Sequence, residues 1–276
     1  MKIATWNVNS IKVRLEHLIK WMDLARIDAV VLQETKTVDE LFPLAELQAA
    51  GFDAVFLGQK TYNGVALVTR KSTIRSVSDV VYNIPGYPDE QKRMIAADLE
   101  HVSGTKLRFA GVYVPNGTEL GSNRYLYKLD WMSALTTWVR EQLQSKTPLV
   151  LAGDFNVAPT DADVWDPEAW KGNLLVSPPE REAFERLIKA VLWTPGRSVC
   201  TRPKPTVGGI IVRPVLKRTT VCALTTFSPP STSPSASGKS RSIPCRAHGK
   251  NRAIMRRWLS SLIKLLVREF FECSLI

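Results

Sequence analysis

The order of hydrophobic patterns along the chain is the feature that most restricts its fold. Up to residue 190, apolar runs typical of strands alternate with segments whose apolar residues recur at helical spacing. The expected strands cover residues 2–8, 28–34, 52–58, 62–70, 94–100, 106–115 and 148–154. The expected helices cover residues 11–22, 39–51, 124–143 and 179–190, the first capped by Ser10. This order predicts an α/β protein in which helices cover β-sheets.

The composition changes at the point where this order stops. Through Ala190 the chain has 22 Lys and Arg against 24 Asp and Glu, and beyond it 15 against 2. Residues 228–240 are rich in serine and proline, as in disordered linkers, while residues 254–271 can form a basic amphipathic helix. The sequence therefore predicts one domain over residues 1–190, followed by an aberrant, basic and disordered tail over residues 191–276.

The cysteines and the hydropathy pattern indicate a cytoplasmic protein. The cysteines all lie in the basic part, at spacings that match no zinc site, and are expected to be unpaired thiols in a reducing compartment: Cys200, Cys222, Cys245 and Cys273. The N-terminus has no secretory pattern, and no apolar run is long enough to span a bilayer.

Polar side chains stand at the ends of several predicted strands, where open α/β sheets collect functional groups. They are Asn7, Glu34, Tyr113 with Asn116, and Asp154 with Asn156. Any one of them, taken alone, is more often a turn residue or a helix cap. Together they form a set that suits phosphate chemistry.

That chemistry follows from the residue types. Mg²⁺ prefers carboxylate oxygens and keeps several waters, which Glu34 with Asn7 can satisfy. A neighbouring aspartate, Asp154, can orient or deprotonate a water. Amide and phenol donors such as Asn156 and Tyr113 can hold phosphate oxygens as charge develops. The set predicts metal-assisted hydrolysis of a phosphate ester.

Several segments resemble bacterial exodeoxyribonuclease III, a branch of the endonuclease/exonuclease/phosphatase superfamily. They include MKIATWNVNS, LQETK, YNGVALVTR, YVPNG and LAGDFNVAPTDADVW, and the resemblance is nearly continuous over residues 1–190. It implies a four-layer α/β sandwich, in which two packed, mostly antiparallel β-sheets are flanked by helices. It also implies a monomeric DNA-repair nuclease that uses Mg²⁺ or Mn²⁺. Such an enzyme removes nucleotides from 3′ ends of double-stranded DNA and cuts 5′ to abasic sites.

The resemblance also implies a role for each matching residue. Glu34 would bind the metal with Asn7 in support, and Asp154 and Asn156 would lie at the same metal site. Tyr113 would contact the scissile phosphate. Asp154 would position the attacking water, and Asn156 would stabilise the pentacovalent state.

A further set of residues is expected to bind the DNA substrate. Asn116 belongs to the YVPNG motif, and Arg93 and Lys128 are basic residues expected on the same face. All of them could contact the DNA backbone.

The family completes its site with motifs that this chain lacks. They are K-T-Y-S-W-W-D-Y-R, G-L-R-I-D-H-I with a second metal-side aspartate, and P-S-D-H-A-P with the catalytic histidine and its aspartate. The histidines present are His17, His101 and His248. None lies in such a motif.

The missing motifs can nevertheless be read from the same codons in another frame. Residues 221–227, VCALTTF, can be encoded so that codons regrouped by one base read G-L-R-I-D-H-I. The same shift converts residues 204–212 to K-T-Y-S-W-W-D-Y-R and residues 248–258 to W-K-K-P-S-D-H-A-P-V. We hypothesise that one base is lost near the codons for Ala190 and Val191, which would impair the enzyme.

Other functions fit parts of the sequence. The same polar residues suit phosphoinositide phosphatases and sphingomyelinases of the superfamily, since a shared fold does not fix the substrate. The basic tail suits an inactive nucleic-acid-binding fragment. The terminal amphipathic segment suits a membrane-surface role, although the prediction is of a protein without membrane association.

Overall fold

A computed structural model of the chain describes residues 1–164, 166–192, 198–201, 211–214 and 220–224. These residues belong to the first of two compact units, Met1–Pro229. The Ser/Pro-rich segment, the amphipathic segment, His248, Cys245 and Cys273 lie outside the described residues. Within the described part, no helix combines the length and apolarity that a bilayer crossing needs.

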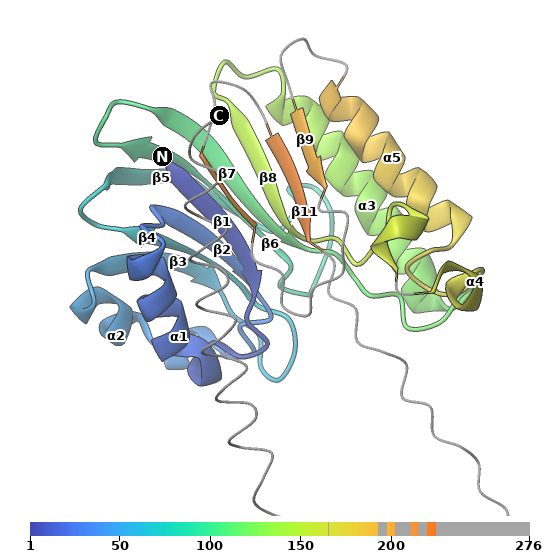
Figure 1. Ribbon diagram of the computed structural model, residues 1–276, viewed down its shortest axis with the longest axis horizontal. Helices are drawn as coiled ribbons and strands as arrows, with labels where there is room; N and C mark the ends of the chain where they lie inside the picture. The colour runs from blue at the N-terminus through green and yellow to red at the C-terminus, as the bar shows by residue number, and fades with distance from the viewer. Residues whose placement is uncertain (165, 193–197, 202–210, 215–219, 225–276) are drawn as a thin grey trace, which may run out of the picture. The chain divides into compact units, whose positions relative to one another are not determined.

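The first sheet combines one parallel pair with antiparallel neighbours. Its strand order is β10 (Ile211–Pro214), β1 (Lys2–Asn7), β2 (Ala29–Gln33), β4 (Val65–Arg70) and β3 (Phe52–Leu57). β1 and β2 are parallel, with Ile3 opposite Ala29 and Asn7 opposite Gln33. Their carboxyl ends therefore lie at the same edge of the sheet (Figure 1).

The second sheet has an antiparallel part and a parallel part. Its order is β5 (Ile74–Tyr82), β6 (Met94–His101), β7 (Lys106–Tyr113), β8 (Leu149–Asp154), β11 (Thr220–Leu224) and β9 (Ser198–Thr201). β5, β6 and β7 are antiparallel, whereas β7, β8, β11 and β9 run parallel. Tyr113 lies opposite Asp154 at the ends of β7 and β8.

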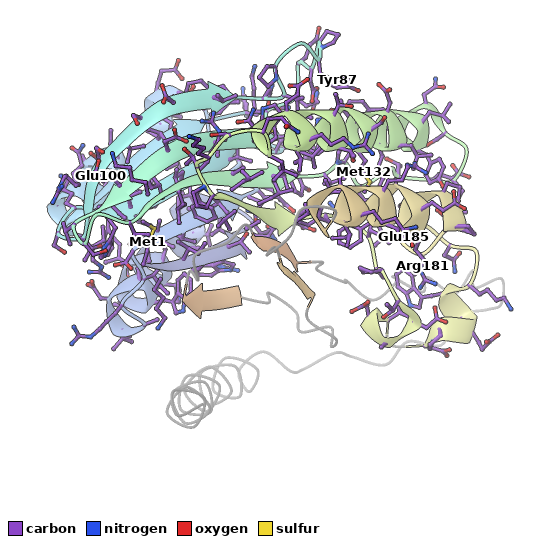
Figure 2. The ribbon with its side chains drawn as sticks, turned by 90° about the horizontal axis from the view of Figure 1, so that it is seen from above. Met1, Tyr87, Glu100, Met132, Arg181 and Glu185 are labelled. Atoms are coloured by element: carbon purple, nitrogen blue, oxygen red, sulfur yellow. The ribbon has the colours of Figure 1, made fainter. Side chains whose placement is uncertain are left out.

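Helices cover the outer face of each sheet. α1 (Ile11–Leu24) and α2 (Leu44–Ala49) pack on the first sheet, and α3 (Asn123–Gln142) and α5 (Pro178–Leu192) pack on the second. A third cluster of buried residues joins the two sheets face to face. Figure 1 shows these layers, and Figure 2 shows α3, with Met132 labelled, beside α5, with Glu185 labelled. The predicted four-layer α/β sandwich is confirmed, although both sheets are mixed.

Some predicted elements differ in detail. The helix expected over residues 39–51 is divided by Pro43 into η1 (Asp39–Leu41) and α2, because proline cannot donate a backbone hydrogen bond inside a helix. Ser10 precedes α1 with φ 90°, and its side chain makes no capping hydrogen bond. β5 was not predicted, because this edge strand has exposed residues along most of its length and no clear alternation.

The fold also contains short elements between β8 and α5. They are η2 (Asp161–Asp163) and α4 (Pro167–Trp170). In α4 the Asp166 side chain accepts a hydrogen bond from the Ala169 backbone nitrogen, and Pro167 occupies the first helical position.

Three short strands follow Ala190, where the sequence predicts no regular structure. β10 pairs with β1, and β11 pairs with β8 and β9. Strand pairing uses backbone groups, which every residue except proline supplies in full, so it does not require a hydrophobic pattern. β11 lies next to the strand that ends at Asp154.

The two sheets lie in close contact at a glycine. A Cβ atom added to Gly111 of β7 would lie 2.6 Å from Cβ and 2.7 Å from Cγ1 of Val31 in β2. Both distances are far shorter than van der Waals contact. Because Val31 is fully buried in a strand, it cannot move aside as a flexible surface side chain would.

We expect Gly111→Ala to destabilise the protein by about 1–3 kcal/mol, the usual cost of overpacking a core. The expected result in urea-induced unfolding is a lower midpoint with an unchanged slope, because the surface exposed on unfolding is nearly the same. A midpoint equal to that of the parent would contradict the close sheet contact.

Candidate active site

The carboxyl ends of β1, β2, β7 and β8 bring the predicted polar residues together. β1 and β2 form a parallel pair in the first sheet, and β7 and β8 form one in the second. The sheets face each other, with β1 against β8 and β2 against β7. Side chains that follow these strands therefore meet at one edge of the sandwich.

Asn7 links the carboxylates of two different sheets. Its Nδ2 donates to Glu34 Oε1 at 2.7 Å and to Asp154 Oδ2 at 3.0 Å. Its Oδ1 accepts a hydrogen bond from the Asn9 backbone nitrogen at 3.1 Å. One amide thus holds two acidic side chains close together and offsets part of their mutual repulsion.

Glu34 lies directly after β2 in a left-handed conformation, with φ 54°. Its carboxylate also accepts hydrogen bonds from Tyr113 Oη at 3.0 Å and lies 2.8 Å from Lys36 Nζ. Burial acts to raise the pKa of Glu34, but the hydrogen bonds from Asn7, Lys36 and Tyr113 and the charge of Lys36 outweigh it. The pKa of Glu34 is therefore held below its usual value, and the group is a carboxylate at neutral pH.

Asp154 and Asn156 form a compact turn after β8. The Asn156 backbone nitrogen donates to Asp154 Oδ1 at 3.1 Å, and Asn156 has φ 47°. Asn156 Nδ2 donates to the Val114 carbonyl oxygen at 2.8 Å, which ties this turn to the segment after β7. Asn116 is exposed, and its Nδ2 is 3.5 Å from Asn156 Oδ1.

Tyr113 completes the group from the end of β7. Burial raises the pKa of its phenol, and the negative charges of Glu34 and Asp154 raise it further. The phenol therefore stays protonated over the physiological pH range. It can act as a hydrogen-bond donor towards an anion.

The fold and this geometry can be compared with known proteins. The model of the Endonuclease/Exonuclease/phosphatase family matches residues 4–241 of the chain. The chain belongs to this family.

Relatives with solved structures or known activities cover a similar part of the chain. An exodeoxyribonuclease of Bacillus subtilis is 31% identical over 195 residues, which is 69% of this chain and 72% of the relative. The 3′ phosphatase NExo from Neisseria, solved with a product DNA hairpin, is 42% identical with a TM-score of 0.63, covering 69% of this chain and 71% of that one. An AP endonuclease from Archaeoglobus fulgidus is 32% identical with a TM-score of 0.62, covering 68% and 70%.

The oxygen atoms gathered in this family member fit a hard divalent cation. Glu34 and Asp154 contribute carboxylates, and Asn7 lies between them. Among the described residues there is no cluster of three or more acidic, cysteine or histidine side chains. Mg²⁺ usually keeps several waters, so a site with two protein carboxylates is compatible with it.

The sequence predicts that Arg93 and Lys128 contact the DNA backbone, but in the structure both side chains are buried. Arg93 is 9% exposed, donates to the Tyr113 carbonyl oxygen at 3.2 Å, and its guanidinium lies 5.1 Å from the Tyr113 ring centroid. Lys128 is fully buried and forms an ion pair with Glu180 of α5. In these positions both side chains contact the protein beneath the site, and the Lys128 ammonium is not accessible to a DNA phosphate.

Two charged residues near the site were missed by the sequence reasoning. Lys36 comes shortly after Glu34 in the LQETK motif and forms an ion pair with it. Its position in that motif is a signal in the sequence that it lies near the site. Glu180 comes from a helix distant in sequence, and nothing near it in the sequence indicates a link to the site.

We expect Asn7→Leu to lower the free energy of unfolding by about 1–3 kcal/mol, because two closely spaced carboxylates lose a shared donor. Urea-induced unfolding at neutral pH measures this change. The control is Asn173→Ala, which removes an exposed amide that donates to the Ala169 carbonyl oxygen and should change stability by less. Equal losses in the two variants would contradict the bridging role of Asn7.

Proposed function

We propose that the chain is a metal-dependent DNA-repair nuclease of the exodeoxyribonuclease III type. It would hydrolyse phosphodiesters as a 3′–5′ exonuclease on duplex DNA and as an endonuclease 5′ to abasic sites. The observation that carries the proposal is the meeting of Asn7, Glu34, Tyr113, Asp154 and Asn156 at one edge of the sandwich. The names of the relatives, an exodeoxyribonuclease, a 3′ phosphatase bound to DNA and an AP endonuclease, support a DNA substrate.

The cation in this proposal is Mg²⁺ or Mn²⁺, held by Glu34 and Asp154 with Asn7 and Asn156 beside them. When bound, it would neutralise negative charge on the phosphate. Glu34 is suited to this role because its lowered pKa keeps it ionised.

Asp154 is the residue proposed to orient the attacking water and accept its proton. It is 1% exposed, and Asn7 and the Asn156 backbone nitrogen both donate to its carboxylate. These bonds fix the carboxylate in one orientation, as a positioned general base requires. Its burial shields the carboxylate from bulk water.

Tyr113 and Asn156 are the proposed donors to the phosphate oxygens. The Tyr113 phenol keeps its proton because its pKa is raised, and its single hydrogen, donated to Glu34 in the structure, would turn to the phosphate when substrate binds. An amide nitrogen carries two hydrogens, and the bond from Asn156 to the Val114 carbonyl oxygen uses one of them. Asn116, which is exposed beside Asn156, is proposed to contact the DNA backbone. Fixed donors of this kind stabilise charge as it develops in the transition state.

The described part of the chain supports the hypothesis that the enzyme is impaired. β11, Thr220–Leu224, overlaps the segment whose regrouped codons read G-L-R-I-D-H-I, and Leu224 lies opposite Asp154 in the parallel pair with β8. In the regrouped frame, the codon after this strand would encode aspartate. An intact product would thus carry a second acidic residue next to the end of β8, a residue that the present sequence lacks.

The domain division at Ala190 follows from the same hypothesis. Residues 1–190 would be an incomplete nuclease domain and residues 191–276 would be out-of-frame translation, of which β9, β10 and β11 still pair with the two sheets. The alternative is that the chain is an inactive nucleic-acid-binding fragment. The tail has 15 basic and 2 acidic residues, a balance that favours binding to phosphates. We further propose that the protein is a cytoplasmic monomer that acts on DNA without membrane contact.

In a version with the lost base restored, which serves as the parent here, we expect Asn156→Ala to lower kcat for Mg²⁺-dependent cleavage of abasic duplex DNA by about 100-fold to 1,000-fold, the usual cost of removing one preorganised donor. Asn173→Ala, which removes an amide outside the site, is the control and should keep the parent's kcat. Loss of metal with EDTA should abolish cleavage in all versions. Cleavage by Asn156→Ala at the parent's rate would contradict the assignment.

Restoring one base near the codons for Ala190 and Val191 should raise the cleavage rate by several orders of magnitude, because residues that act as a unit are lost together. The measurement compares the 276-residue chain with the frame-restored product on the same DNA. Comparable rates would contradict the impairment. Salt-sensitive DNA binding without cleavage, lost on deleting residues 191–276, would favour the binding fragment.

A further inference from the structure

The Lys128 side chain ends beneath the candidate active site. Its ammonium donates to the carbonyl oxygens of Asn156, at 2.6 Å, and Asn116, at 3.2 Å, and to the carboxylate of Glu180. An ammonium group has three hydrogens, so these acceptors satisfy all of them. Two of its bonds therefore end on the backbone of residues proposed to contact substrate.

Glu180 fixes this ammonium to the helical layer. Its Oε2 accepts hydrogen bonds from the Ser177 backbone nitrogen at 3.2 Å and from Ser177 Oγ at 2.6 Å, immediately before α5. Ser177 Oγ is also 2.7 Å from the Tyr125 hydroxyl of α3. The ion pair is thus anchored on two helices that pack against each other.

The turns that Lys128 contacts have left-handed backbone conformations. Asn156 adopts φ 47°, which asparagine tolerates better than most non-glycine residues do. Gly117, next to Asn116, has φ 98°, and a Cβ atom added there would lie 3.3 Å from Lys128 Cδ. The lysine stem and its ammonium thus fill the space under both turns.

A purely structural role would not require this arrangement. A buried ion pair that only filled the core could be satisfied anywhere along α3 and α5, and apolar pairs often replace such ion pairs without loss of stability. Here the charge is directed at two peptide carbonyls that come from the ends of different strands. The ammonium thus links these two turns by hydrogen bonds.

We propose that the Lys128–Glu180 pair is a positioning device for the active site. By holding the carbonyl oxygens of Asn116 and Asn156, Lys128 sets the direction in which their amides point and the position of the turn that contains Asp154. Lys128 is a positioning residue, because it acts through these turns and does not touch the substrate. Its effect on catalysis rests on the proposed function, whereas its effect on the turns does not.

The first experiment measures the turns directly, by hydrogen–deuterium exchange of the full chain in peptides covering residues 113–118 and 154–159. Lys128→Met should raise the exchange rate there by at least about 10-fold, while peptides from β3 and β4 remain unchanged. The matched control is Arg140→Met, which removes one positive charge from an exposed position on the same helix. Unchanged exchange in both turns, or a uniform increase throughout the chain, would overturn the proposal.

A second variant guards against loss of folding. Lys128→Met combined with Glu180→Gln leaves no unpaired buried charge, and glutamine can still accept hydrogen bonds from Ser177. This double variant should melt close to the parent's temperature and still show faster exchange in the two turns. Parental protection of the turns in this folded variant would overturn the proposal.

The last experiment measures Mg²⁺-dependent cleavage of abasic duplex DNA by variants of the frame-restored product. Lys128→Met should lower kcat by about 10-fold to 100-fold with KM changed less than about 2-fold, since small displacements of catalytic groups carry large penalties. Lys128→Arg, which retains the charge, should recover part of the loss. In the Asn156→Ala background, Lys128→Met should add little, because the two changes act on the same turn.

The outcomes separate the two proposals. Faster exchange in the turns with no cleavage by any version, including the frame-restored product, supports the positioning device and refutes the proposed function. Cleavage with an unchanged kcat in Lys128→Met would overturn the catalytic effect of the pair. Fully additive losses with Asn156→Ala would do the same.

Discussion

The close contact between the two sheets sets the geometry on which the rest of the molecule depends. At Gly111 and Val31 the strands β7 and β2 approach too closely for another methyl group. This contact fixes the distance between the carboxyl ends of the facing strands. Asn7 can reach Glu34 in its own sheet and Asp154 in the other because that distance is short.

Much of the fold and the centre of the site could be predicted from the sequence. Asn7, Glu34, Tyr113, Asp154 and Asn156 each follow a hydrophobic run, and strand ends in sheets of this kind meet at one edge. β5 could not be predicted in this way. Its residues are mostly exposed, so the strand leaves no clear hydrophobic pattern.

The basic residues show a different limit of sequence reasoning. Lysine and arginine side chains are usually exposed, so the sequence predicts surface positions for Arg93 and Lys128. In the structure, Glu180 neutralises the charge of Lys128. The Arg93 guanidinium donates a hydrogen bond to the Tyr113 carbonyl oxygen and lies over the Tyr113 ring. These partners are far away in sequence, and only the packing of helices and turns reveals them. The same contacts place both residues in a supporting layer under the proposed active site.

The bond between Asn7 and Asp154 joins residues that are 147 positions apart. Contacts of such long sequence separation form late, because a long loop must close before they contribute any stability. During synthesis on a ribosome, the Asn7 amide at the end of β1 can therefore reach Asp154 only after β8 has been synthesised. Any nascent chain that stops before β8 carries Glu34 without the opposing carboxylate, so the proposed cation site is complete only once β8 has been synthesised.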